Sequence, residues 1–136
     1  MKKLILLFAL IPGMINPELS QAQSPYPKNY FRSPVDFPIT LAGGFGDVRK
    51  NHFHSGIDVR TGGEEGKPVY AVADGFISRI YISPTGFGKA LYVTHPNGYT
   101  SVYGHLKRLN GPVATWARDQ QYKRELFDLD VQPDGG

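Results

Sequence analysis

Turn-forming residues divide the chain between Ile57 and Leu106 into short β-rich runs, and this punctuation constrains the fold more than any other feature of the sequence. Val, Ile, Tyr and Thr are frequent in the runs, and Gly, Pro, Asn or Asp separates them. Asn97-Gly98 between two such runs is a strong hairpin signal. The pattern predicts an all-β fold with an antiparallel sheet as its core. The expected strands are IDV, PVYAVA, FISRIYIS, KALYVTH and YTSVYGHL.

Three other segments complete the predicted domain, which we assign to residues 41–136. Residues 41–54 are glycine-rich and predict a loop, whereas residues 114–127 have helical composition, with Pro112 near their start. The last segment, DLDVQPDGG, is typical of a new strand, with no later strand left to pair with it. We therefore interpret the sequence as all-β with a short helical insert, incomplete at its C-terminus.

The N-terminal 22 residues have the pattern of a secretory signal peptide. Two lysines precede the apolar run LILLFALI, and Ser20-Gln21-Ala22 supplies small residues for cleavage. The run is shorter than the roughly 20 residues of a membrane-spanning helix. We predict an exported protein of the periplasm or cell envelope that is not integral to the membrane after cleavage. A buried N-terminal helix is the alternative. Residues 23–40, rich in proline, predict an extended lead-in.

Net charge and cysteine content indicate which partners the chain can bind and how its fold can be stabilised. The formal net charge is only +3, without a long basic run, so the sequence does not indicate nucleic-acid binding. The chain has no cysteine, although small exported domains are often stapled by disulfides. Its stability must therefore come from the core, from a metal, or from additional chain.

The stretch NHFHSGIDVR contains the best candidate metal ligands, His54 and Asp58. On a straight strand these residues would lie roughly 13 Å apart, too far to share an ion. A helix is disfavoured by Gly56 and its β-branched neighbours. We therefore predict a bend at Ser55-Gly56 that brings the two side chains together. A surface ion pair is the alternative, and local spacing does not separate the two.

The remaining histidines have weaker local support. His52 lies two residues before His54 and is a further ligand candidate on a strand. His95 is expected at a turn or on the surface. His105, in VYGHL, is predicted to share a strand face with Tyr103 and to line the same groove as the His54–Asp58 pair. A half-buried histidine bonded to a backbone carbonyl is the alternative.

Three segments in order resemble the M23 family of zinc metallopeptidases, the lysostaphin- and LytM-like enzymes that cut peptides of peptidoglycan. The segments are HFHSGIDVRT, GKPVYAVADGFISRI and GFGKALYVTHPNGYTSVYGHL. The resemblance implies zinc as cofactor, peptidoglycan peptides as substrate, and a core related to the lipoyl and biotinyl hybrid barrels. It assigns His54 and Asp58 as zinc ligands and His105 as a catalytic histidine. We expect Asn51 or Ser55 to hydrogen-bond these ligands.

The family's third ligand and second catalytic histidine belong to a later His-x-His segment, which this sequence lacks. His52-Phe53-His54 is no substitute, because it precedes His-x₃-Asp and shares His54 with it. The resemblance therefore implies either part of an active peptidase or a degenerate domain that binds the cell wall or regulates an amidase. A carrier or sugar-binding domain is disfavoured, because VADGF lacks the lysine that lipoyl and biotinyl carriers need at that turn.

Overall fold

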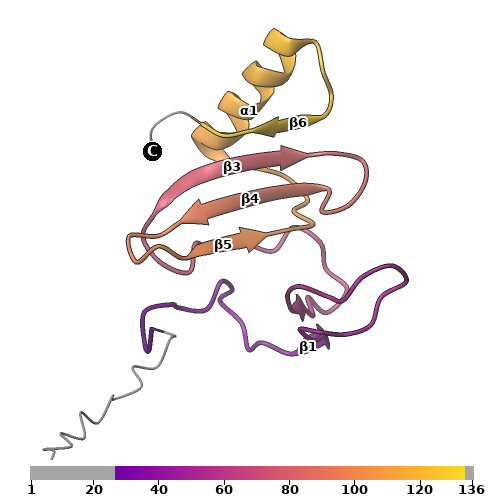
Figure 1. Cartoon of the computed structure of the whole chain (residues 1–136), viewed down its shortest axis with the longest axis vertical. Coiled ribbons are helices and arrows are strands. Elements are labelled where there is room, and N and C mark those ends of the chain that lie inside the picture. Colours follow the sequence, from indigo (N-terminus) through magenta and orange to yellow (C-terminus); the bar gives the residue numbers. More distant parts are fainter. Residues whose placement is uncertain (1–26, 134–136) are drawn as a thin grey trace, which may run out of the picture.

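The computed structural model describes residues 27–133, which form an antiparallel β-structure with one helix (Figure 1). Every strand pair is antiparallel, which confirms the predicted all-β class with a short helical insert. The elements are β1 (Leu41–Gly43), β2 (Asp58–Val59), β3 (Phe76–Ile82), β4 (Lys89–Thr94), β5 (Thr100–Tyr103), α1 (Gly111–Arg124) and β6 (Leu129–Val131).

The main sheet has four strands in the order β5-β4-β3-β6. Its β4–β5 hairpin turns at Asn97-Gly98, as predicted. Gly98 has a φ of 84°, which glycine adopts without steric cost, and its N–H donates to the His95 carbonyl at 2.9 Å. FISRIYIS, KALYVTH and YTSVYGHL thus each supply a strand of this sheet.

The expectation that the last strand has no partner is wrong. Strand β6 pairs with β3, and Ile80 lies opposite Val131. Helix α1 makes this pairing possible, because it returns the chain from the end of β5 to the far side of β3 (Figure 1). With β6 paired to β3, the two outer strands of the sheet are β5 and β6.

The hydrophobic core lies between one face of this sheet and α1. It consists of five buried residues, to which Leu109, Val113 and Trp116 add partly buried surface. Burial of these aliphatic side chains is the main stabilising contribution to the domain. The five are Ile80, Ile82, Ala117, Leu129 and Val131.

Helix α1 begins and ends three residues earlier than the predicted 114–127. Pro112 lies in its first turn, where a proline costs no hydrogen bond, so the helix includes it. Glu125 then adopts a left-handed conformation with φ 53° and ends the helix. Lys123 and Arg124 in the last turn favour the negative end of the helix dipole.

A second, two-stranded sheet pairs β1 with β2 on the β5 side of the molecule (Figure 1). The prediction that residues 41–54 form only loop is therefore wrong. The segment supplies β1 and a further bridge between Val48 and Phe53. Strand β2 lies within the predicted strand IDV, whereas β1, with three residues, is too short to give a recognisable alternation in the sequence.

The segment PVYAVA does not form a strand, contrary to expectation, and makes no hairpin with β3. It lies against the lead-in instead. The Tyr70 N–H donates to the Pro34 carbonyl and the Arg32 N–H to the Val72 carbonyl, each at 2.8 Å. Prolines in the lead-in remove backbone donors, so no regular ladder forms.

The predicted signal peptide, residues 1–22, lies outside the described residues. Within residues 27–133, no helix has the length and apolar character needed to cross a membrane.

Candidate metal site

The chain bends at Gly56 and enters β2 at Asp58, as the sequence predicts. His54 Nε2 and Asp58 Oδ1 lie 3.3 Å apart across this bend. Since four residues of straight strand would separate the side chains by roughly 13 Å, the bend accounts for their proximity. The predicted convergence of His54 and Asp58 is confirmed, while their role as metal ligands stays a prediction.

Backbone hydrogen bonds hold His54 in place on its loop. Its N–H donates to the Asp47 carbonyl at 2.8 Å, and its carbonyl accepts from the Gly46 N–H at 2.7 Å. The Asp47 carboxylate in turn accepts the Gly44 N–H at 2.7 Å. The histidine is thus fixed by the folded loop before any ligand binds.

The ring of His54 has a defined tautomer. Its Nδ1 lies 2.8 Å from the Gly44 carbonyl oxygen, which only accepts, so Nδ1 carries the proton. In the neutral ring Nε2 then has a free lone pair, and this atom is the one that faces Asp58. A histidine whose Nδ1–H bonds to a carbonyl is the arrangement typical of metal-binding imidazoles.

The distance between the two side chains fits one zinc ion. Zn–N and Zn–O bonds of 2.0–2.2 Å at a tetrahedral angle place the two ligand atoms about 3.4 Å apart. The observed separation of Nε2 and Oδ1 is 3.3 Å. The side chains are 18% and 39% exposed, so an ion could reach them from solvent. Donor type, spacing and tautomer therefore all suit zinc.

Arg49 also contacts this pair, a contact that the sequence did not predict. Its Nη2 donates to Asp58 Oδ2 at 2.7 Å. The groups that hydrogen-bond the pair are thus the Gly44 carbonyl and Arg49, not Asn51 or Ser55 as expected. The only signal in the sequence was a basic residue shortly before His-x₃-Asp, because the contact depends on how the loop folds back.

His105 lies two residues beyond the end of β5, and its φ of 54° takes the chain out of the extended conformation. It therefore does not share a strand face with Tyr103, and that prediction is wrong. The Tyr103 hydroxyl accepts the Val72 N–H at 2.9 Å, whereas the exposed His105 ring lies 6.3 Å from that of Phe87.

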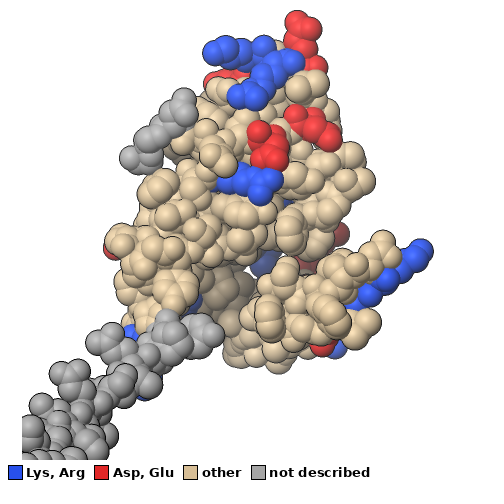
Figure 2. All heavy atoms as spheres, in the orientation of Figure 1, with Lys and Arg blue, Asp and Glu red and all other residues tan. Residues whose placement is uncertain are grey.

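His105 and the His54–Asp58 pair belong to different sheets, because His105 follows β5 of the larger sheet and Asp58 begins β2 of the smaller one. The space-filling view shows a hollow between the part that carries β1 and β2 and the four-stranded sheet (Figure 2). No interaction within residues 27–133 links His105 to His54 or Asp58. Its membership of the same groove stays a prediction.

The other two histidines differ in environment. His52 is exposed, and its carbonyl accepts the Arg49 N–H at 2.9 Å. His95 lies in the hairpin turn, as expected, but is only 2% exposed, so a surface position is wrong. Its Nδ1 lies 2.8 Å from the Asp74 carbonyl and its Nε2 2.9 Å from Ser101 Oγ. His95 therefore ties the hairpin to the neighbouring loop.

No third ligand joins the pair in the part of the chain that the structure describes. Among residues 27–133, no group of three His, Cys, Asp or Glu side chains is placed to hold a metal ion. His52 and His105 are thus not preassembled with His54 and Asp58. The described residues would therefore supply two of the three protein ligands that a catalytic zinc site uses.

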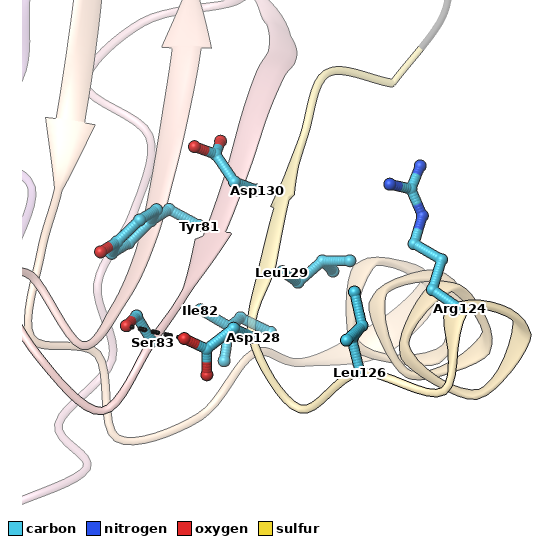
Figure 3. Close-up of a pocket in the computed structure, with 8 residues that line it drawn as sticks. All are labelled: Tyr81, Ile82, Ser83, Arg124, Leu126, Asp128, Leu129 and Asp130. Atoms are coloured by element: carbon cyan, nitrogen blue, oxygen red, sulfur yellow. Dashed lines mark hydrogen bonds between the residues drawn. The ribbon is translucent and has the colours of Figure 1, made fainter.

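A hollow of about 340 Å³ lies elsewhere, between β3, β6 and the end of α1 (Figure 3). Ser83 donates to Asp128 at 3.2 Å, and Arg124 stands across the hollow from the carboxylates. Two hydrogen bonds from Arg79 hold the pKa of Asp130 below its ordinary value of 3.8. The hollow contains none of the predicted site residues. Its lining is Tyr81, Ile82, Ser83, Arg124, Leu126, Asp128, Leu129 and Asp130.

A protein-family model matches the chain. The model of peptidase family M23 matches residues 52–121, a range that includes His54, Asp58 and His105. No curated protein and no solved structure matches the chain. The match covers more than half of the sequence and agrees with the antiparallel fold and the order of the three segments. The chain belongs to peptidase family M23.

Proposed function

We propose that the protein is an exported zinc metallopeptidase that hydrolyses peptide bonds in peptidoglycan. Membership of a peptidase family supports peptide-bond hydrolysis. The observation that carries the zinc assignment is the 3.3 Å approach of His54 Nε2 to Asp58 Oδ1, with the His54 Nδ1 proton directed to Gly44. An ion pair between a protonated His54 and Asp58 would require the same approach, so measured zinc binding distinguishes the two.

His54 and Asp58 would hold the ion from one side. The neutral imidazole donates its lone pair, and the carboxylate lowers the net positive charge of the site. Zinc, when bound, polarises a peptide carbonyl and activates water at neutral pH. The rigid backbone around His54 keeps the imidazole oriented, which reduces the reorganisation needed when substrate binds.

His105 is proposed to act on the substrate rather than on the metal. As charge develops on the carbonyl oxygen, an imidazole N–H aimed at that oxygen supplies a hydrogen bond worth a few kcal/mol in such sites. The His105 backbone is anchored, because its N–H donates to the Phe87 carbonyl at 2.8 Å. Its ring is exposed and therefore accessible to a substrate.

The substrate and the location rest on sequence features. The three segments that resemble lysostaphin- and LytM-like enzymes support peptidoglycan peptides as substrate. The secretory pattern of residues 1–22 supports export to the periplasm or cell envelope. Fusion of this segment to a reporter enzyme, followed by cell fractionation, tests export directly. A reporter retained in the cytoplasm contradicts it.

A second function has one specific observation in its favour. Within residues 27–133 the His54–Asp58 pair lacks a third ligand, as expected for a degenerate M23 domain that binds the cell wall or regulates an amidase. Zinc-independent retention on insoluble peptidoglycan, without turnover, would support this reading over the peptidase.

Zinc binding by residues 23–136 tests the proposed site. Catalytic zinc sites use three protein ligands, so we expect weak binding and no cleavage of peptidoglycan from this segment alone. Binding should disappear in His54→Ala and in Asp58→Ala. A longer chain that adds a His-x-His segment should cleave purified peptidoglycan. Calorimetry and release of soluble peptides measure the two properties.

His52→Ala is the matched control, because it removes a neighbouring exposed histidine that we do not assign as a ligand. It should leave zinc affinity unchanged. Tight one-to-one binding with turnover that is lost in His52→Ala would show that the ligand set is assigned wrongly. Binding that survives His54→Ala would refute the site itself.

A further inference from the structure

Arg49 contacts the His54–Asp58 pair from the side opposite to the predicted ion. Its Nη2 donates to Asp58 Oδ2 at 2.7 Å and lies 3.3 Å from His54 Nδ1. The atoms assigned to the ion are the other two, His54 Nε2 and Asp58 Oδ1. The guanidinium therefore leaves both predicted ligand atoms free.

The contact of Arg49 with His54 is not a hydrogen bond. His54 Nδ1 already donates its proton to the Gly44 carbonyl, and a guanidinium nitrogen can only donate. Arg49 thus has a single strong partner in this pair, the Oδ2 atom of Asp58. A charge-assisted bond of this kind fixes which carboxylate oxygen is engaged and which is free.

The backbone of β1 confines this arrangement. A Cβ at Gly43 would lie 2.5 Å from Arg49 Nη2 and 2.5 Å from Asp58 Oδ2. Real Cβ atoms do not approach so closely, so a side chain at Gly43 would displace the Arg49–Asp58 contact. The glycine therefore allows the ion pair to pack directly against β1.

We propose that Arg49 is a positioning residue for zinc, which presents Asp58 to the ion through Oδ1 alone. The inference rests on the proposed function. With Oδ2 engaged by Arg49, Oδ1, which lies 3.3 Å from His54 Nε2, is the carboxylate oxygen that would hold the ion. The positive charge of Arg49 also repels the ion, but the Arg49 and Asp58 side chains are each 39% exposed and solvent screens the repulsion. Orientation is therefore the larger effect.

The test measures zinc affinity of the full chain by calorimetry. Loss of a group that hydrogen-bonds a metal ligand typically weakens binding about 10–100-fold. We expect such a loss in Arg49→Met, and a smaller loss in Arg49→Lys, which keeps the charge and a donor for Oδ2. Equal or tighter binding by Arg49→Met would overturn the proposal, because repulsion would then be the larger effect.

Two glycine variants separate positioning from simple loss of structure. Gly43→Ala should weaken zinc binding in the same direction as Arg49→Met, because it displaces the same contact. Gly56→Ala is the matched control, since a Cβ there meets nothing within 4 Å and its φ lies outside the positive range. Equal zinc affinity in Gly43→Ala and the parent chain would contradict the proposal.

The melting temperature of each metal-free variant completes the design. If Arg49 is a positioning residue, Arg49→Met should lose zinc affinity while its melting temperature stays nearly unchanged. Arg49→Lys should then retain part of the zinc affinity that Arg49→Met loses. A large fall in melting temperature that Arg49→Lys does not reverse would mean a structural role only. If the parent chain itself binds no zinc through His54 and Asp58, the proposed function fails first, which is a distinct result.

Discussion

The four-stranded sheet and the two-stranded sheet of this protein differ in what holds them together. The larger sheet covers a continuous aliphatic core with α1, and its strands share long antiparallel registers. The smaller sheet has two very short strands, and Val48 and Phe53 in its loop are 81% and 70% exposed. Apolar burial stabilises the first, whereas backbone bonds and one ion pair define the second.

This division separates stability from chemistry. The predicted metal ligands lie in the small sheet and its loop, where little apolar surface is buried, and the core lies in the large sheet. Substitutions in the two regions should therefore affect different properties of the protein. Changes in the large sheet should lower the free energy of unfolding, and changes in the small sheet should alter ligand binding at nearly constant stability.

The largest expected difference between the regions follows from truncating one aliphatic side chain in each. Ile80→Ala leaves a cavity in the core and should lower the free energy of unfolding by about 2–5 kcal/mol. Val48→Ala, at an exposed position, should change it by less than about 0.5 kcal/mol. Denaturant unfolding followed by circular dichroism measures both. Similar losses in the two variants would contradict the separation of core and site.

Removal of a histidine ring should give the next largest difference. His95→Phe preserves most of the volume but leaves the Asp74 carbonyl without the bond it receives from Nδ1. A hydrogen bond of this part-buried kind contributes about 0.5–1.5 kcal/mol, and we expect a loss in this range. His52→Phe, at an exposed position near the metal site, is the control and should be close to neutral. If His52→Phe were the more damaging variant, the assignment of roles would be reversed.

The smallest expected effect concerns the Arg–Asp pairs, of which each region has one. Arg79 donates two hydrogen bonds to Asp130, whereas Arg49 donates one to Asp58. Exposed pairs contribute at most about 1 kcal/mol, so Asp130→Asn should destabilise by up to that amount at neutral pH. Asp58→Asn should cost less, and should instead abolish zinc binding.

The pH dependence of Asp130→Asn provides a sharper measurement. The Arg79 hydrogen bonds lower the pKa of Asp130 in the folded state below its ordinary value of 3.8. Its contribution is thus fully present above pH 3.8 and is lost as the pH falls through the folded pKa. The stability difference between parent and variant should shrink in that range. A constant difference down to pH 2 would refute this origin.

The sequence predicts the large sheet well because its signals are local. The β4–β5 hairpin follows from Asn97-Gly98, and the helix is recognisable from its composition, with its bounds displaced because Pro112 belongs to the first turn. The partner of β6 could not be predicted in the same way. Its pairing with β3 depends on where α1 returns the chain, which no short window of sequence contains.

At the candidate site, the sequence predicts the convergence of His54 and Asp58 from glycine and spacing alone. It does not predict Arg49, because that contact requires the chain to fold back between β1 and β2. The wrong prediction that His105 shares a strand face with Tyr103 has a similar cause. Alternation holds only while the chain is extended, and the positive φ of His105 lies just beyond the end of β5.

The pairing of β6 with β3 has a consequence for the order of folding. Strands β3, β4 and β5 join through short loops and can form rapidly, whereas β6 must wait for the intervening strands and α1. Until β6 arrives, the outer edge of β3 and the aliphatic surface around Ile80 are exposed to other chains. During synthesis this interval lasts until Leu129–Val131 have been made, and it is the period in which a growing chain is most vulnerable to aggregation.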